Sequence, residues 1–189
     1  MEKPQDLRII KTHKALLEAF MELLEEKLFE DITVHELCER AMVRRATFYK
    51  HFADKYEFFT FFIREIQAKF KSETNPLRTA ETPHEYLVAM TQKLIEFLAE
   101  RQRMVNRLSK SKMMPSLINM LSEQMILDAK EKMAESVKSG HELPATPEFL
   151  ASFYVGGILQ VLFRRFTQKT QLTDSSIMTE IETILKPFS

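Results

Sequence analysis

The chain has 189 residues and no net charge, because 27 basic residues balance 27 acidic ones; it contains three glycines and a single cysteine, Cys38. This composition excludes a uniformly basic protein that coats nucleic acid, and it excludes an internal disulfide. Because few glycines are present to form hairpin turns, we expect an all-α fold of about nine helices in a reducing cytoplasm, with neither a signal peptide nor a membrane span.

The first part of the chain predicts helices that begin at capping signals. Apolar residues recur at helical spacing over residues 6–27. Thr33 stands three residues before Glu36, the spacing of a capping box, and this predicts a short helix through Arg40. After a turn at "AMV", a second short helix is expected over residues 44–52.

Further capping signals divide the rest of the chain. Asp54 is the expected N-cap of a longer helix that ends near Lys71. Residues 72–83 are polar and contain two prolines, which predicts a linker, and Thr82 is the expected N-cap of the helix that follows. The remaining helices are expected over residues 102–110, 115–138, 147–168 and 174–186.

The helix expected over residues 147–168 is apolar on nearly every side, and such a helix must be covered on every side. Gly156 and Gly157 cost this helix about 1 kcal/mol each relative to alanine, which close approach by another helix would offset. With the last helix, it predicts a four-helix dimer interface across a two-fold axis; a central core helix of a monomer is the alternative. The predicted interface residues are Phe149, Phe153, Gly156, Gly157, Leu159, Gln160, Phe163, Ile177, Ile181 and Ile184.

Residues 38–59, "CERAMVRRATFYKHFADKYEFF", gather positive charge. Between residues 40 and 55 five cations accompany one anion, Asp54, so the local charge is +4 (five minus one). Two short helices joined by a tight turn, with cations on the second, are typical of a helix-turn-helix whose second helix enters the major groove of DNA. The alternative is a solvated basic face on an ordinary helical bundle. The five cations are Arg40, Arg44, Arg45, Lys50 and Lys55.

The second short helix carries side chains that suit DNA. Arg44 or Arg45, at its N-terminus, can donate two hydrogen bonds to guanine O6 and N7, which is worth about 1–3 kcal/mol of discrimination. Phe48 and Phe52, four residues apart, are expected to face inward. Two hydroxyls and three further basic side chains can contact phosphates: Thr47, Tyr49, Lys50, His51 and Lys55.

Residues 32–58, "ITVHELCERAMVRRATFYKHFADKYEF", resemble the N-terminal helix-turn-helix of the TetR family of bacterial transcriptional regulators. The matching positions are Thr33, Val34, Ala41, Val43, Thr47, Tyr49, His51, Phe52 and Lys55. The resemblance implies a DNA-binding domain over residues 1–53 and a helical effector-binding and dimerisation domain over residues 54–189. It also implies that Arg45 reads a base and that His35 reaches the edge of the groove. The predicted DNA-binding residues are Thr33, His35, Arg44, Arg45, Thr47, Tyr49, Lys50, His51 and Lys55.

Three residues depart from the family pattern. Met42 replaces the usual turn glycine, and a positive φ there would strain the chain by about 1 kcal/mol. Arg44 replaces the usual serine, which removes an N-cap and adds charge. Cys38 replaces a small alanine, and its apolar neighbours favour a packed core thiol over a redox sensor.

The body of the chain is rich in methionine and phenylalanine, which can line an adaptable apolar pocket. Plain core packing is the alternative for each of these residues. The resemblance implies that small effectors bind between the body helices. The candidate pocket residues are Phe62, Ile66, Met90, Leu94, Met104, Leu121, Met125 and Phe153.

Together these features predict a homodimeric repressor that binds a palindromic operator in double-stranded DNA and is released by an apolar small molecule. A TetR-fold adaptor or coactivator that docks on another protein, or a ligand-carrying bundle that never touches DNA, are the alternatives. We expect no enzymatic activity, cofactor or metal, because the five histidines lack ligand spacing and neither a phosphate loop nor a nucleophile elbow is present.

Overall fold

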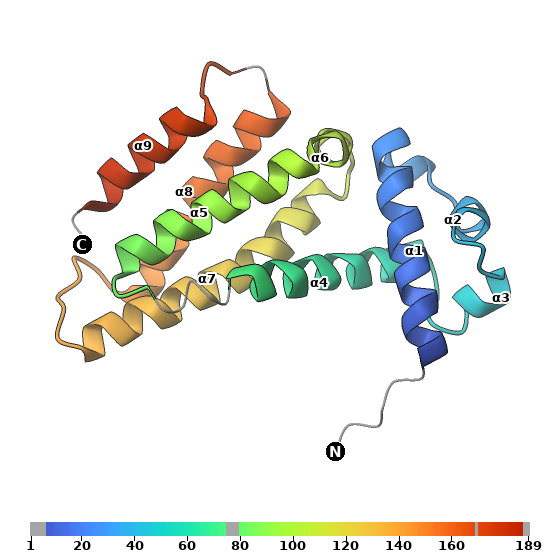
Figure 1. The fold of residues 1–189 in the computed structure, drawn as a ribbon, viewed down its shortest axis with the longest axis horizontal. Coiled ribbons are helices and arrows are strands. Elements are labelled where there is room, and N and C mark those ends of the chain that lie inside the picture. The colour runs from blue at the N-terminus through green and yellow to red at the C-terminus, as the bar shows by residue number, and fades with distance from the viewer. Residues whose placement is uncertain (1–6, 75–79, 169, 187–189) are drawn as a thin grey trace.

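The computed structural model describes residues 7–74, 80–168 and 170–186. Within these ranges the protein has nine α-helices, one 3₁₀ helix and no strand, which confirms the all-α prediction. Helices α1–α3 form one end of the molecule, and α4 joins them to a larger helical body (Figure 1). Of the predicted linker at residues 72–83, residues 75–79 lie outside the described part of the chain.

The N-terminal end of the molecule begins its helices at the predicted caps. The Thr33 hydroxyl accepts a hydrogen bond from Glu36 N, and the Glu36 carboxylate accepts one from Thr33 N, so the capping box is confirmed. The Asp54 carboxylate accepts hydrogen bonds from Tyr56 N and Glu57 N, as expected of an N-cap. The elements here are α1 (Leu7–Glu26), η1 (Phe29–Asp31), α2 (Val34–Arg40), α3 (Arg45–Phe48) and α4 (Lys55–Thr74).

Helix α3 is shorter than predicted, because regular helix ends at Phe48 and not near residue 52. The chain continues in tight turns, with hydrogen bonds from Lys50 N to Thr47 O and from His51 N to Phe48 O. Arg44 offers no side-chain cap at the N-terminus of α3, and this helix has four residues.

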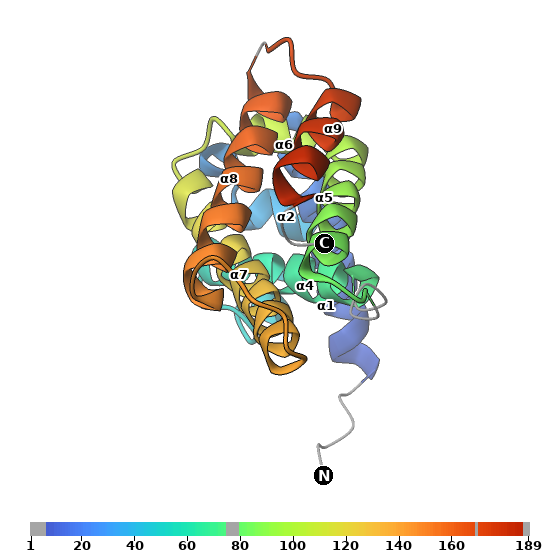
Figure 2. The same cartoon turned by 90° about the vertical axis from the view of Figure 1, so that its left-hand side faces the viewer.

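The body contains five helices, three of which begin at a capping threonine: Thr82, Thr146 and Thr173. Helix α7 packs along α8 and crosses α4 and α5, while α9 packs on α5. Figure 2 views the molecule from the end remote from α1–α3, with α8 and α9 in front. The five helices are α5 (Pro83–Glu100), α6 (Gln102–Leu108), α7 (Met114–Lys138), α8 (Pro147–Thr167) and α9 (Asp174–Leu185).

A cluster of phenylalanines forms the core of the N-terminal end. The Phe20 ring centroid lies 5.2 Å from that of Phe58 and 5.0 Å from that of Phe62, both in edge-on contact. Met104 and Leu108 from α6 complete this core, so the body closes over it. Phe62 therefore does not line the body cavity, contrary to the prediction. Because this core includes the first half of α4, the domain boundary between residues 53 and 54 remains a prediction.

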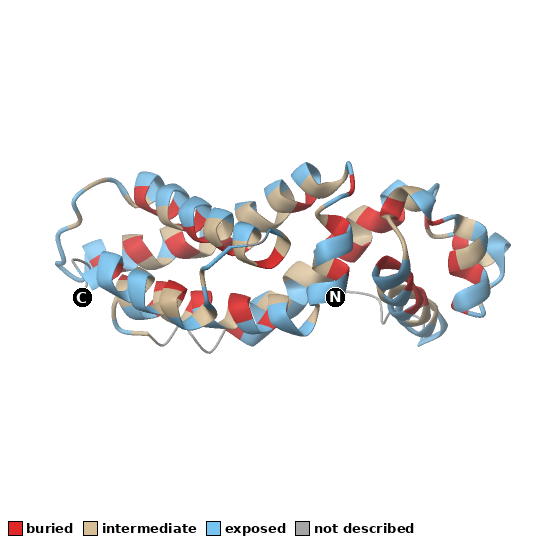
Figure 3. Cartoon of the chain, turned by 90° about the horizontal axis from the view of Figure 1, so that it is seen from above, coloured by how far each residue is buried: buried red, intermediate tan, exposed pale blue. Residues whose placement is uncertain are grey.

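A second core fills the body, centred on α8 between α5 and α7. The buried residues form a continuous internal layer along the molecule, with exposed residues outside it (Figure 3). In the described part of the chain, α8 is the one helix long and apolar enough to cross a membrane by length and composition, and 33% of its most apolar window is buried within the protein. Its apolar residues divide between this core and an exposed face.

Candidate DNA-binding surface and effector cavity

The turn between α2 and α3 is closed by two backbone hydrogen bonds. Val43 N donates to Cys38 O at 2.9 Å and Met42 N donates to Glu39 O at 3.1 Å, the pattern of a Schellman motif. This motif places Met42 at a φ of 53°, in the left-handed region where glycine is favoured. Strain was predicted for Met42 if its φ were positive, and that condition is met. The Met42 side chain is 94% exposed, so packing within the chain does not compensate for it.

Two residues of α2, just before this turn, pack inward or pair with acids. Cys38 is buried, and its burial raises the pKa of the thiol, in agreement with the core-thiol reading. Arg40 donates to Glu26 and Glu22, and these hydrogen bonds hold the pKa of Arg40 above its usual range. Arg40 therefore does not add free charge to the basic stretch, because α1 already neutralises it.

The basic side chains of α3 and the turn after it have no such partners. Arg44, Arg45 and Lys50 are exposed, and within the described residues none of them enters an ion pair. Guanidinium groups on the first turn of a helix-turn-helix recognition helix are placed to contact base edges. The surface thus presents three uncompensated cations from a neutral chain.

Inward aromatic rings hold α3 in place, as predicted. Phe48 is fully buried and Phe52 is 6% exposed. The Tyr49 ring contacts the Phe48 ring edge-on, with centroids 5.5 Å apart, yet half of Tyr49 remains exposed. Burial of Phe48 therefore fixes Tyr49 and half-buried Thr47 beside the exposed arginines.

His51 lies against a residue that the sequence did not single out. Its ring centroid is 5.0 Å from that of His13 on α1, in an edge-on arrangement. Burial, together with the nearby His51, lowers the pKa of His13 and thus favours its neutral form. No local pattern predicts this contact, because the two histidines are far apart in sequence and meet only through packing.

Lys55 has a different place from the one predicted. Its ammonium group donates to three backbone oxygens, Phe29 O at 3.2 Å, Glu30 O at 2.8 Å and Ile32 O at 2.9 Å. An ammonium group has three protons, so these acceptors use all of its donors. The prediction that Lys55 grips a phosphate is therefore wrong for this conformation, and Lys55 instead ties α4 to η1.

The two candidates near the start of α2 are also partly engaged. The Thr33 hydroxyl donates to Glu36 Oε2 at 2.9 Å, within the capping box. Glu36 also accepts from Lys27 at 2.6 Å, and this hydrogen bond lowers the pKa of Glu36 to about 2. His35 is exposed and lies 3.5 Å from Glu39 on the same helix.

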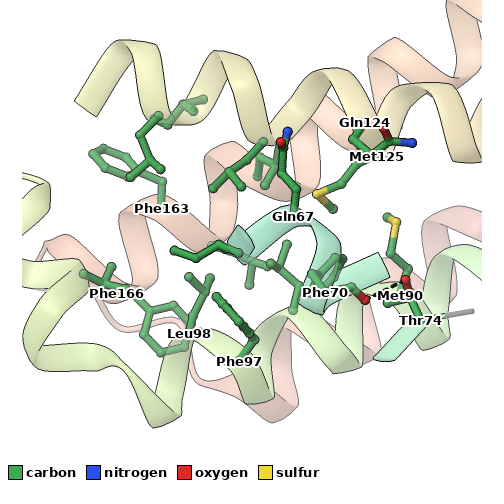
Figure 4. Close-up of a pocket in the computed structure, with 18 of the residues that line it drawn as sticks. Gln67, Phe70, Thr74, Met90, Phe97, Leu98, Gln124, Met125, Phe163 and Phe166 are labelled. Atoms are coloured by element: carbon green, nitrogen blue, oxygen red, sulfur yellow. Dashed lines mark hydrogen bonds between the residues drawn. The ribbon is translucent and has the colours of Figure 1, made fainter. Parts of the chain in front are cut away.

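An apolar cavity of about 120 Å³ lies among α4, α5, α6, α7 and α8 (Figure 4). Six of the eight candidate pocket residues line it: Ile66, Met90, Leu94, Met104, Leu121 and Met125. Phe62 and Phe153 do not, because Phe62 belongs to the N-terminal core and Phe153 is 63% exposed on α8. The sequence reading missed Gln67, Phe70 and Phe97, which share the helical faces of the predicted residues.

The exposed face of α8 is apolar. Phe149 and Phe153 are 60% and 63% exposed, and their rings stack at a centroid distance of 6.1 Å. A Cβ atom added at Gly156 or Gly157 would meet nothing within 4 Å, so no helix in the described part of the chain approaches these glycines. Ile184 on α9 is also exposed, but Ile177 is buried inside the subunit and is not part of this face. Leu159 and Phe163 instead line the cavity.

The fold and the site define an all-helical protein in which an N-terminal helix-turn-helix is joined to a helical body around an apolar cavity. Residues 16–60 match the family model described as bacterial regulatory proteins, tetR family. Residues 16–60 of this chain are therefore similar to the N-terminal region of the TetR family.

Individual relatives agree with this assignment. A Bacillus subtilis (strain 168) protein described as an uncharacterized HTH-type transcriptional regulator, YxbF, is 33% identical over 98 residues, which are 51% of this chain and 25% of that protein. The chain spans about a quarter of the length of the curated relatives that it matches. Two solved structures share the fold. The fatty acid degradation regulator FadR from Bacillus halodurans has a TM-score of 0.74 at 14% identity, covering 98% of this chain and 96% of its own. A TetR-family regulator from Mesorhizobium loti has a TM-score of 0.71 at 18% identity, covering 97% of each chain. At such identities the likeness concerns the fold alone.

Proposed function

We propose that this chain is a transcriptional regulator that binds double-stranded DNA through α3. The observation that carries the proposal is the exposure of Arg44 and Arg45 at the N-terminus of a packed recognition helix, without an acidic partner in the described residues. A guanidinium group without a partner is costly to bury inside a protein. On the surface it can instead form two parallel hydrogen bonds to guanine.

Phosphate contacts would surround this base-reading tip. Tyr49, Lys50 and His51 follow α3 directly, and Thr47 lies one turn from Arg44. Hydroxyl and basic side chains in these positions donate to phosphate oxygens and set the orientation of the protein on the duplex. In this proposal Lys55 supports the surface from inside and does not touch DNA.

The regulator would act as a homodimer through the exposed faces of α8 and α9. Phe149, Phe153 and the two open glycines form an apolar strip that no part of the described chain covers. A second copy, related by a two-fold axis, covers such a strip with the same strip of its own. The two α3 helices would then read a palindrome with half-sites about 34 Å apart or somewhat more.

Repression and release by an apolar effector complete the proposal. The cavity is bounded by α4, the helix that carries the DNA-binding end, and by α8, the helix of the proposed dimer face. A molecule that binds the cavity more tightly in one spacing of the two DNA-binding ends shifts the dimer toward that spacing. We place this regulator in the cytoplasm, where its DNA is.

A binding selection over randomised DNA tests the proposal. Arg45→Ala is expected to relax base preference at one position per half-site, at a cost of about 1–3 kcal/mol. Lys50→Ala is expected to weaken all sequences alike and to reduce the salt slope by about 1. Arg103→Ala, which removes an exposed arginine from α6, is the matched control and should change neither. If the wild-type protein binds no DNA even at low salt, the proposal is wrong, and an adaptor or a ligand-carrying bundle takes its place.

A further inference from the structure

The charges that face the cavity cancel each other. Among the described residues that line it, Lys71 on α4 and Asp128 on α7 carry charge, and Lys71 Nζ lies 3.6 Å from Asp128 Oδ1. Asp128 also accepts a hydrogen bond from Gln124 Nε2 at 3.1 Å. The Asp128 side chain is 15% exposed, whereas Lys71 is 48% exposed and reaches solvent. The cavity therefore offers no uncompensated charge to a ligand.

The uncharged polar groups of the cavity are also engaged. Gln67 Nε2 donates to Met120 O, and Thr74 Oγ1 donates to Phe70 O at 2.9 Å. Figure 4 shows Thr74 and Gln124 toward one end of the cavity, with Phe163 and Phe166 at the other. A ligand thus meets one weakly polar end, at the seam between α4 and α7, and an apolar remainder.

A charged head group would disturb this arrangement. A carboxylate that took Lys71 as its partner would have to compete with Asp128, whose side chain is 15% exposed, for the same cation. It would also lose its own hydration in an apolar cavity, which is unfavourable for a charged group. A neutral head group leaves the pair intact and needs at most one hydrogen bond.

The size of the cavity sets a second limit. An apolar cavity of about 150 Å³ accepts a single benzene ring, and this one has about 120 Å³. Met90, Met104 and Met125 in its wall can adjust to the shape of a small ligand. The available space therefore suits one ring or a short chain better than a long acyl chain.

We infer that the effector of this chain is a small uncharged apolar molecule, with at most one hydroxyl-type head group at the α4–α7 end, and not a fatty acid. This inference rests on the proposed function. A fatty acid is the natural competitor, because the similarly folded FadR from Bacillus halodurans is a fatty acid degradation regulator.

The first experiment compares 1-hexanol with hexanoate, and adds palmitate, by calorimetric titration of the purified protein without DNA. The two smaller probes share one chain and differ in head group. We expect 1-hexanol to bind at least about tenfold more tightly than hexanoate, and palmitate not to bind. Hexanoate or palmitate binding as tightly as 1-hexanol, or no binding of 1-hexanol, would overturn the inference.

A charge-changing variant distinguishes the effect of the Lys71–Asp128 ion pair on ligand affinity from the general preference of apolar cavities for uncharged molecules. Asp128→Asn releases Lys71, so hexanoate should gain about tenfold in affinity while 1-hexanol changes little. Glu123→Gln removes an exposed acid from the same helix and is the matched control. An unchanged ratio of the two affinities in Asp128→Asn contradicts the inference, and the wild-type comparison stands even if that variant fails to fold.

In a last experiment, each probe is added to the protein bound to its selected DNA, and release of the DNA is measured by fluorescence anisotropy. 1-Hexanol should release the DNA at concentrations where hexanoate does not. If 1-hexanol binds the free protein but does not release the DNA, small uncharged apolar molecules are not the effector of this chain. Absence of DNA binding in the first place would instead refute the proposed function, and the titrations without DNA would still report on the cavity.

Discussion

Glu30 and Ser111, 81 residues apart in sequence, are joined by a hydrogen bond of 2.8 Å from the serine hydroxyl to Glu30 Oε1. The same oxygen accepts a hydrogen bond from Lys112 N at 2.7 Å. Glu30 belongs to η1, beside the DNA-binding helices, and Ser111 lies in the turn between α6 and α7. Burial of the Glu30 carboxyl favours its neutral form, but hydrogen bonds from its own backbone, Ser111 and Lys112 outweigh this and lower its pKa overall. The DNA-binding end and the helical body are therefore linked by a hydrogen-bond acceptor at a defined point.

Removing this acceptor should destabilise the fold. Glu30→Ala leaves the buried Ser111 hydroxyl and Lys112 N without their partner, at an expected cost of about 1–3 kcal/mol in urea unfolding. A double-mutant cycle with Ser111→Ala should show that the two losses are not additive. Glu25→Ala, at an exposed position on α1, is the control. Additive effects would show that the bond contributes nothing measurable.

Lys55 should contribute to the stability of the fold, whereas Lys50 should contribute to the affinity for DNA. Lys55→Met removes three hydrogen bonds to backbone oxygens and should lower the free energy of unfolding by about 1–3 kcal/mol, with the salt slope of DNA binding unchanged. Lys50→Met should change stability by less than about 0.5 kcal/mol and reduce the salt slope by about 1. Chemical unfolding and salt titrations of both variants decide the matter. A reduced salt slope with normal stability in Lys55→Met would restore the phosphate contact.

The strain at Met42 can be measured against a second motif of the same kind. Met42→Gly should stabilise the protein by up to about 1 kcal/mol, since glycine adopts a positive φ without strain. Helix α7 ends in the same hydrogen-bonding pattern, with Gly140 at a φ of 93°. Gly140→Ala should therefore destabilise by a similar amount, because an added Cβ there meets no atom and changes only the backbone preference. Equal melting temperatures for Met42→Gly and wild type would show that the turn carries no strain.

The proposed dimer face is tested by filling its open glycines. Gly157→Leu has free space in a single subunit and replaces a poor helix former, so the subunit should remain folded and helical. In a dimer the added side chain would separate the two α8 helices, and we expect a monomer at micromolar concentration by sedimentation. Asn106→Leu adds the same bulk at an exposed position on α6 and should leave the assembly unchanged. A Gly157→Leu protein that sediments as wild-type dimer places the interface elsewhere.

Acid should weaken the link between α1 and α2. The hydrogen bond from Lys27 lowers the pKa of Glu36 from its ordinary value of 4.5 to about 2. Because the pKa is lower in the folded state, the stabilisation is fully present above about 4.5 and is lost as the pH falls toward 2. The difference in unfolding free energy between wild type and Glu36→Gln should therefore shrink over that range. A constant difference across it would mean that the charge of Glu36 has no part in stability.

Several features followed from short stretches of sequence. The caps at Thr33, Asp54 and Thr82 were predicted because a cap depends on residues within one helical turn of it. The sequence predicted strain at Met42 only if its φ were positive, and the structure supplies that positive φ. Six of the eight candidate cavity residues line the cavity, because apolar periodicity marks the inner face of each helix.

The sequence by itself determined where most helices begin, which faces they bury and where cations gather, since these depend on neighbours in the chain. Only the tertiary structure decided that Lys55 serves η1, that His51 meets His13, that Phe62 and Ile177 turn into separate cores, and that Gly156 and Gly157 stay uncovered. The reason is that the partner of a side chain on a helix depends on how whole helices cross, and that is set by packing among residues far apart in the chain.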